Sequence, residues 1–245
     1  NLMQGKTHEN IKTIRPLKDG VIADFDASEQ MINLFIKSIP TLKNKLFSPS
    51  LVMVICIPSG ITEVEMRAVK ESAERVNGKE VYLIHEPMAA AIGIGVDIMQ
   101  PKGNMIIDIG GGTTEIAVMS LGGVVYSRSL RIAGDAMDVA LQNYMREEYN
   151  LLIGDSTAEK IKKEVGTAIP TNNNKYPVKG RDIRSGTPKE INVTEEDTAA
   201  ALNPILKEMI GGIKMALENT PPELSADLVD MGLTLTGGGA LLKNI

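Results

Sequence analysis

Residues 105–115 read MIIDIGGGTTE, so an apolar run ends near a carboxylate, Asp108, and is followed by three glycines and two threonines. Glycine lets consecutive backbone amides turn toward one anion without a clash from Cβ, and threonine adds hydroxyl donors. A carboxylate in this place can hold Mg²⁺, directly or through a water molecule. The sequence therefore predicts a metal-binding residue, Asp108, and a phosphate-binding turn made of Gly110, Gly111, Gly112, Thr113 and Thr114.

The segment after the glycines is again apolar and runs from Ile116 to Leu121, so the turn joins two strands. The dinucleotide-binding and Walker loops instead open into a helix, whose N-terminus faces the phosphates. A glycine hairpin of this kind points away from Rossmann enzymes and toward a different class of ATP-binding protein.

The composition is that of an ordinary globular protein with one large or two medium cores, because 43% of the 245 residues are hydrophobic and 23% are charged. The net charge is −5, and aromatic residues make up 3% of the chain, with no tryptophan. A chain without a basic face or stacking aromatics is not expected to bind nucleic acid.

The single cysteine, Cys56, cannot form an internal disulfide, which fits a reducing cytoplasm. It lies in the apolar run 51–57, and we expect a small buried side chain in a core strand. No apolar run reaches the roughly 18 residues of a membrane-spanning helix. Asn1 is not an initiator methionine and Ile245 falls where a helix should begin, so we interpret the sequence as a fragment that lacks both termini.

Strands and helices alternate before the glycine turn. The apolar run 51–57 is expected at the buried centre of a sheet, and Thr62 and Glu65 form a capping box for the next helix. A strand at 81–85 and a small-residue helix at 88–95 complete a parallel crossover unit.

After the turn, the sequence predicts a strand at 124–129 that extends the hairpin into a meander, and then mainly helices. The helices are expected at 135–149, at 194–219, at 223–230, and after a second capping box at Ser156 to Glu159. The stretch 166–193 is polar, with short strands at 176–178 and 190–193, and is interpreted as a small subdomain.

Near the end of the sequence, a strand at 233–236 leads into a second glycine turn and a terminal helix. This turn has no acidic neighbours, which suits close backbone approach to a sugar or a purine. Glu86 lies where a parallel strand becomes a helix, the edge at which α/β proteins place their chemistry. A carboxylate there can orient or deprotonate a water molecule, or it can simply stabilise the helix dipole, and both interpretations stay open.

Five segments, in this order and spacing, resemble the MreB family of bacterial actins, the rod-shape-determining proteins. They are HEPMAAAIG at 85–93, DIGGGTTE at 108–115, AEKIK at 158–162, PPEL at 221–224 and LTGGGALL at 235–242. The match spans essentially the whole chain. Its motifs separate this family from sugar kinases, heat-shock chaperones and FtsA, which share the actin-like ATPase fold.

The resemblance implies an α/β protein with two ribonuclease H-like lobes around a nucleotide cleft. It also implies a division into subdomains. These are a remnant of subdomain IB at 1–15, an incomplete subdomain IA at 16–100, subdomain IIA at 101–136 and 198–245, and subdomain IIB at 137–197.

The resemblance assigns roles to the singled-out residues. Glu86 and Asp108 would be catalytic, the first by positioning the hydrolytic water and the second by serving Mg²⁺ and water. The first glycine turn would cradle the β- and γ-phosphates of ATP, and the nucleoside would contact Glu159, Lys160, Ile161, Lys162, Gly237, Gly238, Gly239 and Ala240. Without the resemblance, Glu159 and Lys162 would be interpreted as an ordinary solvated helix face.

Residues 43–49 read KNKLFSP and place Leu46 and Phe47 beside lysines, a pattern of loops that insert into the headgroup region of an anionic membrane. From the residues alone, the alternative is that both side chains fold onto the protein's own core. The resembled family carries a Leu-Phe membrane loop at the matching place, which favours insertion.

The implied function is that of an ATPase whose hydrolysis of ATP, with Mg²⁺, is coupled to polymerisation into actin-like filaments. Such filaments would lie in the cytoplasm, peripheral on the inner face of the cell membrane. There they would work with the cell-wall elongation machinery to direct wall synthesis and maintain rod shape.

Two other interpretations stay open. One is another ATPase or small-molecule kinase of the same superfamily, and the other is a nucleotide-binding scaffold with negligible turnover. The family's amino-terminal Asp-Leu-Gly-Thr hairpin and its carboxy-terminal strand and helix are absent from the sequence. We therefore expect this sequence to carry one half of a phosphate clamp.

Overall fold

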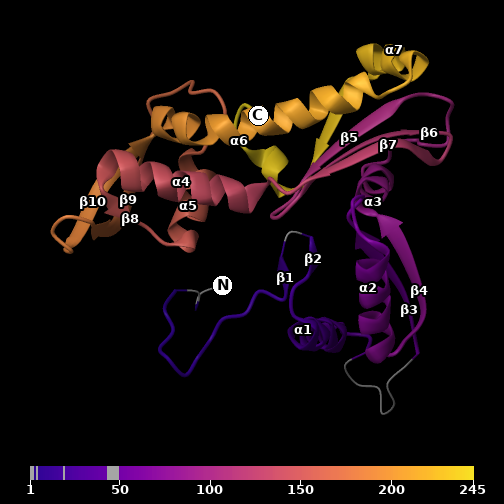
Figure 1. Ribbon diagram of the computed structural model, residues 1–245, viewed down its shortest axis with the longest axis horizontal. Coiled ribbons are helices and arrows are strands. Elements are labelled where there is room, and N and C mark those ends of the chain that lie inside the picture. The colour runs from indigo at the N-terminus through magenta and orange to yellow at the C-terminus, as the bar shows by residue number, and fades with distance from the viewer. Residues whose placement is uncertain (1–2, 4, 19, 43–49) are drawn as a thin grey trace.

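The computed structural model describes residues 3, 5–18, 20–42 and 50–245. The chain forms two bodies, which meet where helix α3 (Glu86–Gly93) of the lower body packs beneath the sheet of the upper body (Figure 1). The upper body holds a four-stranded sheet, the long helix α6 and a smaller three-stranded sheet, and the lower body holds the strands and helices before residue 100.

The four-stranded sheet organises the upper body, with strand order β11-β5-β6-β7. Its strands are β5 (Asn104–Ile109), β6 (Thr114–Ser120), β7 (Gly123–Leu130) and β11 (Leu233–Thr236). The strands β5, β6 and β7 form the predicted antiparallel meander, whereas β11 lies parallel to β5.

Alternate side chains of a strand point to opposite faces of a sheet. Buried clusters cover both faces of this sheet. Ile107 and Ile116 pack into the main core with helices α4 (Gly134–Tyr149) and α6 (Glu195–Glu218). Ile106 and Ala117 pack on the other face against α3 (Glu86–Gly93). Sheet burial on both faces explains why the central residues of β5 and β6, 105–107 and 116–119, are all apolar.

The lower body contains the predicted parallel crossover unit. Strands β3 (Leu51–Ile57) and β4 (Gly78–His85) are parallel, and α2 (Glu63–Arg75) connects them. The capping box is confirmed, because Thr62 accepts a hydrogen bond from the amide of Glu65 and Glu65 accepts one from the amide of Thr62.

The prediction that 51–57 is a buried central strand is wrong, because alternate side chains of β3 are exposed. Val52 and Val54 are each 67% exposed, and Cys56 is also exposed. Within the described residues β3 pairs only with β4, and the alternating exposure of its side chains shows that one face of this two-stranded sheet is open to solvent. An apolar run alone does not distinguish a strand covered on both faces from one covered on a single face.

Two elements near the N-terminus were not predicted. The hairpin of β1 (Leu17–Lys18) and β2 (Val21–Ile22) precedes helix α1 (Phe25–Ser38). The side chain of Asp24 caps α1 by accepting a hydrogen bond from the amide of Ala27. An aspartate directly before an amphipathic run is the signal that could have indicated this helix.

The polar stretch after residue 166 forms most of the smaller sheet, with strand order β10-β9-β8. Its strands are β8 (Leu151–Leu152), β9 (Lys175–Asp182) and β10 (Pro188–Thr194), and α5 (Asp155–Val165) packs against β9. The predicted capping box at Ser156 is wrong, because α5 begins at Asp155 after Gly154 and has no side-chain cap. Glu159 instead forms an ion pair with Lys163 at 2.6 Å.

The C-terminal part follows the predicted order with one difference. Helix α6 is capped by Thr194, and α7 (Pro222–Met231) leads into β11. After β11 the chain makes a single 3₁₀ turn, η1 (Gly238–Leu241), where the sequence predicted a helix. Three glycines in a row supply few side chains to pack, so a longer helix gains little there.

Candidate active site

The turn between β5 and β6 lies against the start of helix α4. The amide of Gly110 donates to the carbonyl of Thr113 at 2.9 Å, and the carbonyls of Gly110 and Gly111 accept from the first two amides of α4 at 3.1 and 2.8 Å. In the described part of the chain, the amides of Gly111 and Gly112 have no partner. Two amides of the turn are therefore free to donate, which is compatible with the predicted phosphate site.

The two threonines of the turn are oriented inward. Thr113 is 7% exposed, and a Cβ built on Gly20, which lies between β1 and β2 with φ +79°, would lie 3.2 Å from the Cγ2 of Thr113. Thr114 is fully buried, and its hydroxyl donates to the carbonyl of Ile132 at 2.6 Å. The prediction that the Thr114 hydroxyl binds phosphate does not hold, since that donor already closes an internal hydrogen bond.

The two glycine turns lie side by side because β11 is parallel to β5 and in register with it. Thr236 is paired with Asp108, so Gly237 follows β11 next to the end of β5. Gly237 has φ +82°, and a Cβ there would lie 2.4 Å from the carbonyl oxygen of Ile109 and 2.5 Å from a carboxylate oxygen of Asp108. Glycine is required at this position both for its conformation and for space.

Glu86 is the first residue of α3 and approaches the same strand end from the lower body. Burial raises the pKa of Glu86 to about 7, with further contributions from the negative charges of Glu115 and Asp108. Asp108 and Glu115 are paired across β5 and β6, and the charges of both reach Glu86. A glutamate with a pKa near neutrality is well matched to general acid–base catalysis at physiological pH.

Cys56 belongs to this neighbourhood and not to the core. Burial raises the pKa of its thiol, and the charges of Glu86 and Asp108 raise it further. Cys56 is paired with Ile84 in the β3–β4 register, directly before the strand end that leads into Glu86. The thiol is thus kept protonated, and a reactive thiolate is disfavoured.

Glu115 is a site residue to which sequence reasoning gave no role. It is 1% exposed, and its carboxylate accepts hydrogen bonds from the amide of Ser59 at 2.8 Å and from the hydroxyl of Ser129 at 2.5 Å. Ser59 lies in the loop before α2, so Glu115 joins the lower body to the central sheet. The available signal was a carboxylate inside an otherwise apolar strand, which requires buried partners.

Lys162 links α5 to the start of α4. Its ammonium group donates to the carbonyl of Gly134 at 2.7 Å and forms an ion pair with Asp138 at 2.8 Å. Burial raises the pKa of Asp138, and the hydrogen bond from Lys162 opposes that increase. Gly134 also donates its amide to the carbonyl of Gly110, so Gly134 connects Lys162 to the glycine turn.

The other residues of the predicted nucleoside face differ in their exposure. Lys160 is exposed, and the carboxylate of Glu159 has a lowered pKa, mainly because it accepts a hydrogen bond from Lys163. Ile161 is fully buried in the main core. The prediction that Ile161 contacts a ligand therefore does not hold for its side chain, which the helix period turns away from Lys160.

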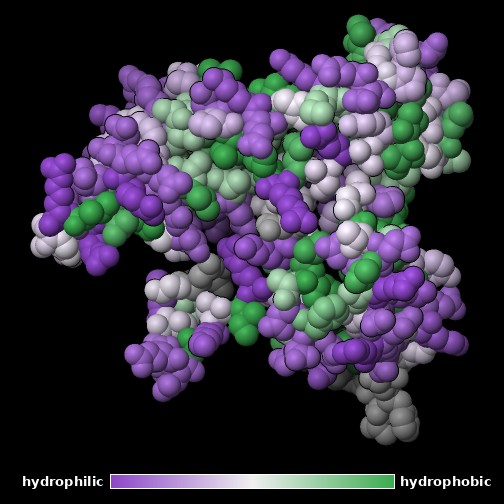
Figure 2. All heavy atoms as spheres, viewed as in Figure 1, coloured by the Kyte–Doolittle hydropathy of each residue, from purple (hydrophilic) through white to green (hydrophobic). Residues whose placement is uncertain are grey.

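A cavity of about 600 Å³ adjoins the phosphate turn between the two bodies. It is lined by Gly112, by residues of α4, by N-terminal residues that include the cations Arg15 and Lys18, and by Arg131, which follows β7. Arg15 spans it with a 3.1 Å ion pair to Asp135 at the start of α4. Figure 2 shows hydrophilic side chains gathered where the N-terminal segment approaches the upper body.

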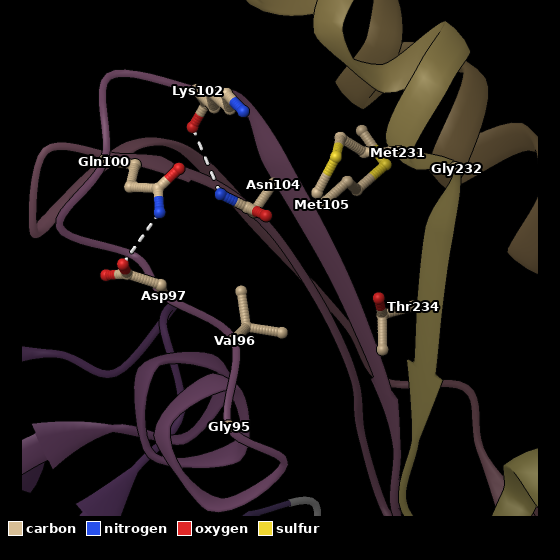
Figure 3. A pocket seen from close by; sticks show the side chains of 10 residues that line it. All are labelled: Gly95, Val96, Asp97, Gln100, Lys102, Asn104, Met105, Met231, Gly232 and Thr234. Carbon is tan, nitrogen blue, oxygen red and sulfur yellow. Dashed lines mark hydrogen bonds between the residues drawn. The ribbon is translucent and has the colours of Figure 1, made fainter.

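A second cavity, of about 270 Å³, lies at the opposite end of β5 and β11 (Figure 3). Met105 and Met231 lie next to each other on one side of it, and Asp97 and Gln100 lie on the other. It is lined by residues at the start of β5 and β11, whereas Asp108 is the penultimate residue of β5 and Gly237 follows the last residue of β11. This cavity is therefore separate from the phosphate turn.

The donor set suits a metal ion that is held mainly by ligand oxygens and water. Among residues 3, 5–18, 20–42 and 50–245, no group of three or more His, Cys, Asp or Glu side chains could hold a metal ion. Mg²⁺ commonly binds through one or two carboxylates together with substrate phosphates and several waters. Asp108, beside two free turn amides, fits that pattern.

Leu46 and Phe47, the predicted membrane residues, lie outside the described residues. Among the helices that the structure describes, none is long and apolar enough to cross a membrane.

Comparison with known proteins supports the resemblance found in the sequence. The MreB/Mbl protein family model matches residues 1–245. The chain is 48% identical over 244 residues to the cell shape-determining protein MreB of Escherichia coli (strain K12), covering 99% of this chain and 70% of that protein. It is 49% identical to the cell shape-determining protein Mbl of Bacillus subtilis (strain 168), covering 99% of this chain and 72% of that protein.

Solved structures give the same result for the fold. The structure of MreB 5 of Spiroplasma citri bound to AMPPNP superposes with a TM-score of 0.94 at 39% identity, covering 99% of this chain and 72% of that one. The MamK double helical filament, at 23% identity and a TM-score of 0.76, covers 93% of this chain and 68% of that one, and shares the fold. The predicted actin-like ATPase fold is confirmed, and the chain belongs to the MreB/Mbl protein family.

Proposed function

We propose that this protein binds and hydrolyses ATP and couples the hydrolysis to assembly of actin-like filaments. The observation that carries the proposal is the meeting of Glu86, Asp108 and the free amides of Gly111 and Gly112 at one end of β5. A solved relative is described as bound to AMPPNP, which supports nucleotide binding at this fold.

The proposed chemistry is attack of water on the γ-phosphate without a covalent intermediate. Glu86, with its pKa of about 7, orients the attacking water and accepts its proton as the bond to phosphorus forms. The free amides of Gly111 and Gly112 hold phosphate oxygens and offset their charge. Asp108 would hold Mg²⁺, which would supply positive charge that stabilises the ADP leaving group.

The nucleoside is proposed to lie on the other side of the turn, between α5 and the second glycine turn. Glu159, Lys160 and Lys162 would face it from α5, and the backbone of Gly237 to Ala240 would face it from η1. The lack of a Cβ in this glycine segment lets the backbone approach a flat ligand closely.

The subdomain division is also part of the proposal. Residues 16–100 would form IA, residues 101–136 and 198–245 would form IIA, residues 137–197 would form IIB, and residues 1–15 would belong to IB. The hydrogen bond from Ser59 to Glu115 crosses the proposed boundary between IA and IIA and would act near the pivot of lobe closure.

The cellular role is proposed from the names of the relatives, which are cell shape-determining proteins. Filaments of this protein would lie in the cytoplasm on the inner face of the cell membrane, with Leu46 and Phe47 inserted between lipid headgroups. They would direct the cell-wall elongation machinery and so maintain rod shape. The MamK filament shows that this fold can assemble into double helices.

The test uses the protein expressed from its complete natural reading frame, with ATP and Mg²⁺. Phosphate release per molecule should rise with protein concentration as filaments form, and electron microscopy with lipid should show paired filaments or sheets. The Glu86→Ala protein should bind ATP but release little phosphate.

Three results would contradict parts of the proposal. ADP production that depends on an added sugar would indicate a small-molecule kinase. Nucleotide binding without turnover in the parent protein would indicate a scaffold. Unchanged phosphate release by the Glu86→Ala protein would remove Glu86 from the reaction.

A further inference from the structure

Glu195, the first residue of α6, is a buried carboxylate outside the reaction described above. It is 1% exposed, and it accepts hydrogen bonds from the amides of Thr171 and Asn172, both at 2.9 Å, and from the side chain of Asn174 at 3.0 Å. Its fourth partner is the ammonium group of Lys243 at 2.6 Å. This ion pair and the backbone donors lower the pKa of Glu195 to about 2, so the group stays ionised at every physiological pH.

Lys243 lies two residues beyond η1, the turn proposed to contact the nucleoside. Its backbone is bound to the segment that leaves α5, because Thr167 and Lys243 form a parallel bridge. The carbonyl of Lys243 accepts hydrogen bonds from the amide of Ala168 at 2.8 Å and from the hydroxyl of Thr167 at 3.1 Å.

The next residue strengthens the same junction. The side chain of Asn244 donates to the carbonyl of Ile169 at 2.8 Å. The segment after η1 is thus hydrogen-bonded to the segment after α5. Glu195, at the start of α6, forms hydrogen bonds with both segments. Thr198, one turn further along α6, adds a hydrogen bond to the carbonyl of Val165, the last residue of α5.

We propose that the ion pair between Glu195 and Lys243 positions η1 relative to α5 and so sets the affinity of the nucleoside site. The proposal rests on the proposed function, since it requires the nucleoside to bind between these two elements. Glu195 and Lys243 are positioning residues that do not touch the ligand. Buried, fully satisfied carboxylates fix the segments around them, because any movement leaves a desolvated charge without partners.

This positioning role predicts a specific pattern of effects on nucleotide binding and on catalysis. ATP and ADP share the nucleoside, so loosening η1 should weaken the binding of both nucleotides by the same factor. The catalytic step depends on Glu86 and the phosphate turn at the other side of the site, so kcat should be conserved at saturating ATP while KM rises.

The experiment uses the complete natural protein and measures equilibrium binding of fluorescent ATP and ADP analogues, together with kcat and KM for ATP. Lys243→Met keeps the aliphatic stem and removes the charge, Lys243→Arg restores a cation, and Glu195→Gln keeps the shape of the carboxylate. Glu190→Gln is the matched control, because Glu190 pairs with Lys179 at 3.5 Å on the exposed surface of the β9–β10 hairpin.

We expect Lys243→Met and Glu195→Gln to weaken the binding of both nucleotides about tenfold. This is the order of magnitude expected when a charged hydrogen bond is lost. Lys243→Arg and Glu190→Gln should bind like the parent protein. Unchanged affinity in the folded Lys243→Met and Glu195→Gln proteins would overturn the inference, as would a loss confined to ATP or a fall in kcat at constant KM.

The two proposals fail in distinguishable ways. A parent protein that binds neither nucleotide would contradict the proposed function and the positioning role together. A parent that binds and hydrolyses ATP, with variants that bind equally well, would contradict the positioning role alone. If Glu195→Gln does not fold, the comparison of Lys243→Met with Lys243→Arg decides the result, because Lys243 is partly exposed.

Discussion

The carboxylate of Glu115 accepts a hydrogen bond from the backbone amide of Ser59 at 2.8 Å and thereby joins the central sheet to the loop before α2. The other oxygen of Glu115 accepts from Ser129 on β7. The charge of Glu115 is also a neighbour of Glu86 and contributes to its raised pKa. One buried side chain therefore holds the two bodies together and adjusts the proton affinity of the proposed catalytic residue.

Replacing Glu115 should have two measurable effects. Glu115→Ala leaves the amide of Ser59 and the hydroxyl of Ser129 without their acceptor, and should lower the free energy of unfolding by about 2 kcal/mol. Ser129→Ala, the matched control, removes one of the two hydrogen bonds and should cost about half as much. Chemical denaturation of the three proteins measures the difference, and equal stability of all three would show that Ser59 does not depend on this acceptor.

The raised pKa of Glu86 predicts how stability varies with pH. Between the ordinary pKa of 4.5 and the folded value of about 7, the folded protein keeps a proton that the unfolded chain releases. Stability therefore falls as pH rises through this window, because ionisation is disfavoured only in the folded state. Glu86→Gln cannot ionise, so it should raise the melting temperature at about pH 8 and leave it unchanged at about pH 4. An equal effect at both pH values would contradict the raised pKa.

The ionisation of Glu86 should also govern the rate of ATP hydrolysis. Phosphate release should increase as pH rises through the pKa of Glu86, because only the carboxylate accepts a proton from water. Glu86→Gln should lower kcat by roughly 10² to 10⁴ and remove this pH dependence, the range expected for loss of a general base. ATP binding measured in parallel should be retained, and a variant that keeps the parent's pH profile would exclude Glu86 as the titrating group.

The contact between the two glycine turns can be tested with a pair of substitutions. Gly237→Ala places a methyl group 2.4 Å from the carbonyl oxygen of Ile109 in a backbone conformation with φ +82°, and should destabilise the protein by about 2 kcal/mol or more. Gly238→Ala is the matched control, because a Cβ there meets nothing within 4 Å and the backbone is not strained. Thermal unfolding without nucleotide compares them, and equal melting temperatures would mean that β11 moves freely from β5.

The membrane proposal predicts that Leu46→Ser combined with Phe47→Ser weakens sedimentation with anionic liposomes. Two apolar side chains inserted among headgroups contribute roughly 3 kcal/mol, so binding should fall about a hundredfold. The control is Leu121→Ser with Val229→Ser, which removes two exposed apolar side chains elsewhere on the molecule, 67% and 85% exposed. If the control lost as much binding as the loop variant, Leu46 and Phe47 would have no special role.

Most local elements could be predicted because their signals lie within a few residues of each other. The capping box at Thr62 and Glu65 and the strand-turn-strand unit around Gly110 both form as the sequence indicates. The wrong predictions have more than one cause, and only some of them depend on what packs against the segment. Cys56 is exposed because β3 is open on one face, and Ser156 is no cap because α5 begins a residue earlier.

The candidate site also shows which features the local sequence predicts and which depend on tertiary contacts. The sequence alone determined that Asp108 precedes a glycine turn between two strands, because apolar runs, glycines and a carboxylate at that spacing allow few other structures. Only the tertiary structure decided that Gly237 abuts Asp108, that Thr114 is turned inward, and that Glu115 bonds Ser59. These contacts join residues far apart in the chain, and their geometry depends on strand register and packing, which local sequence patterns do not encode.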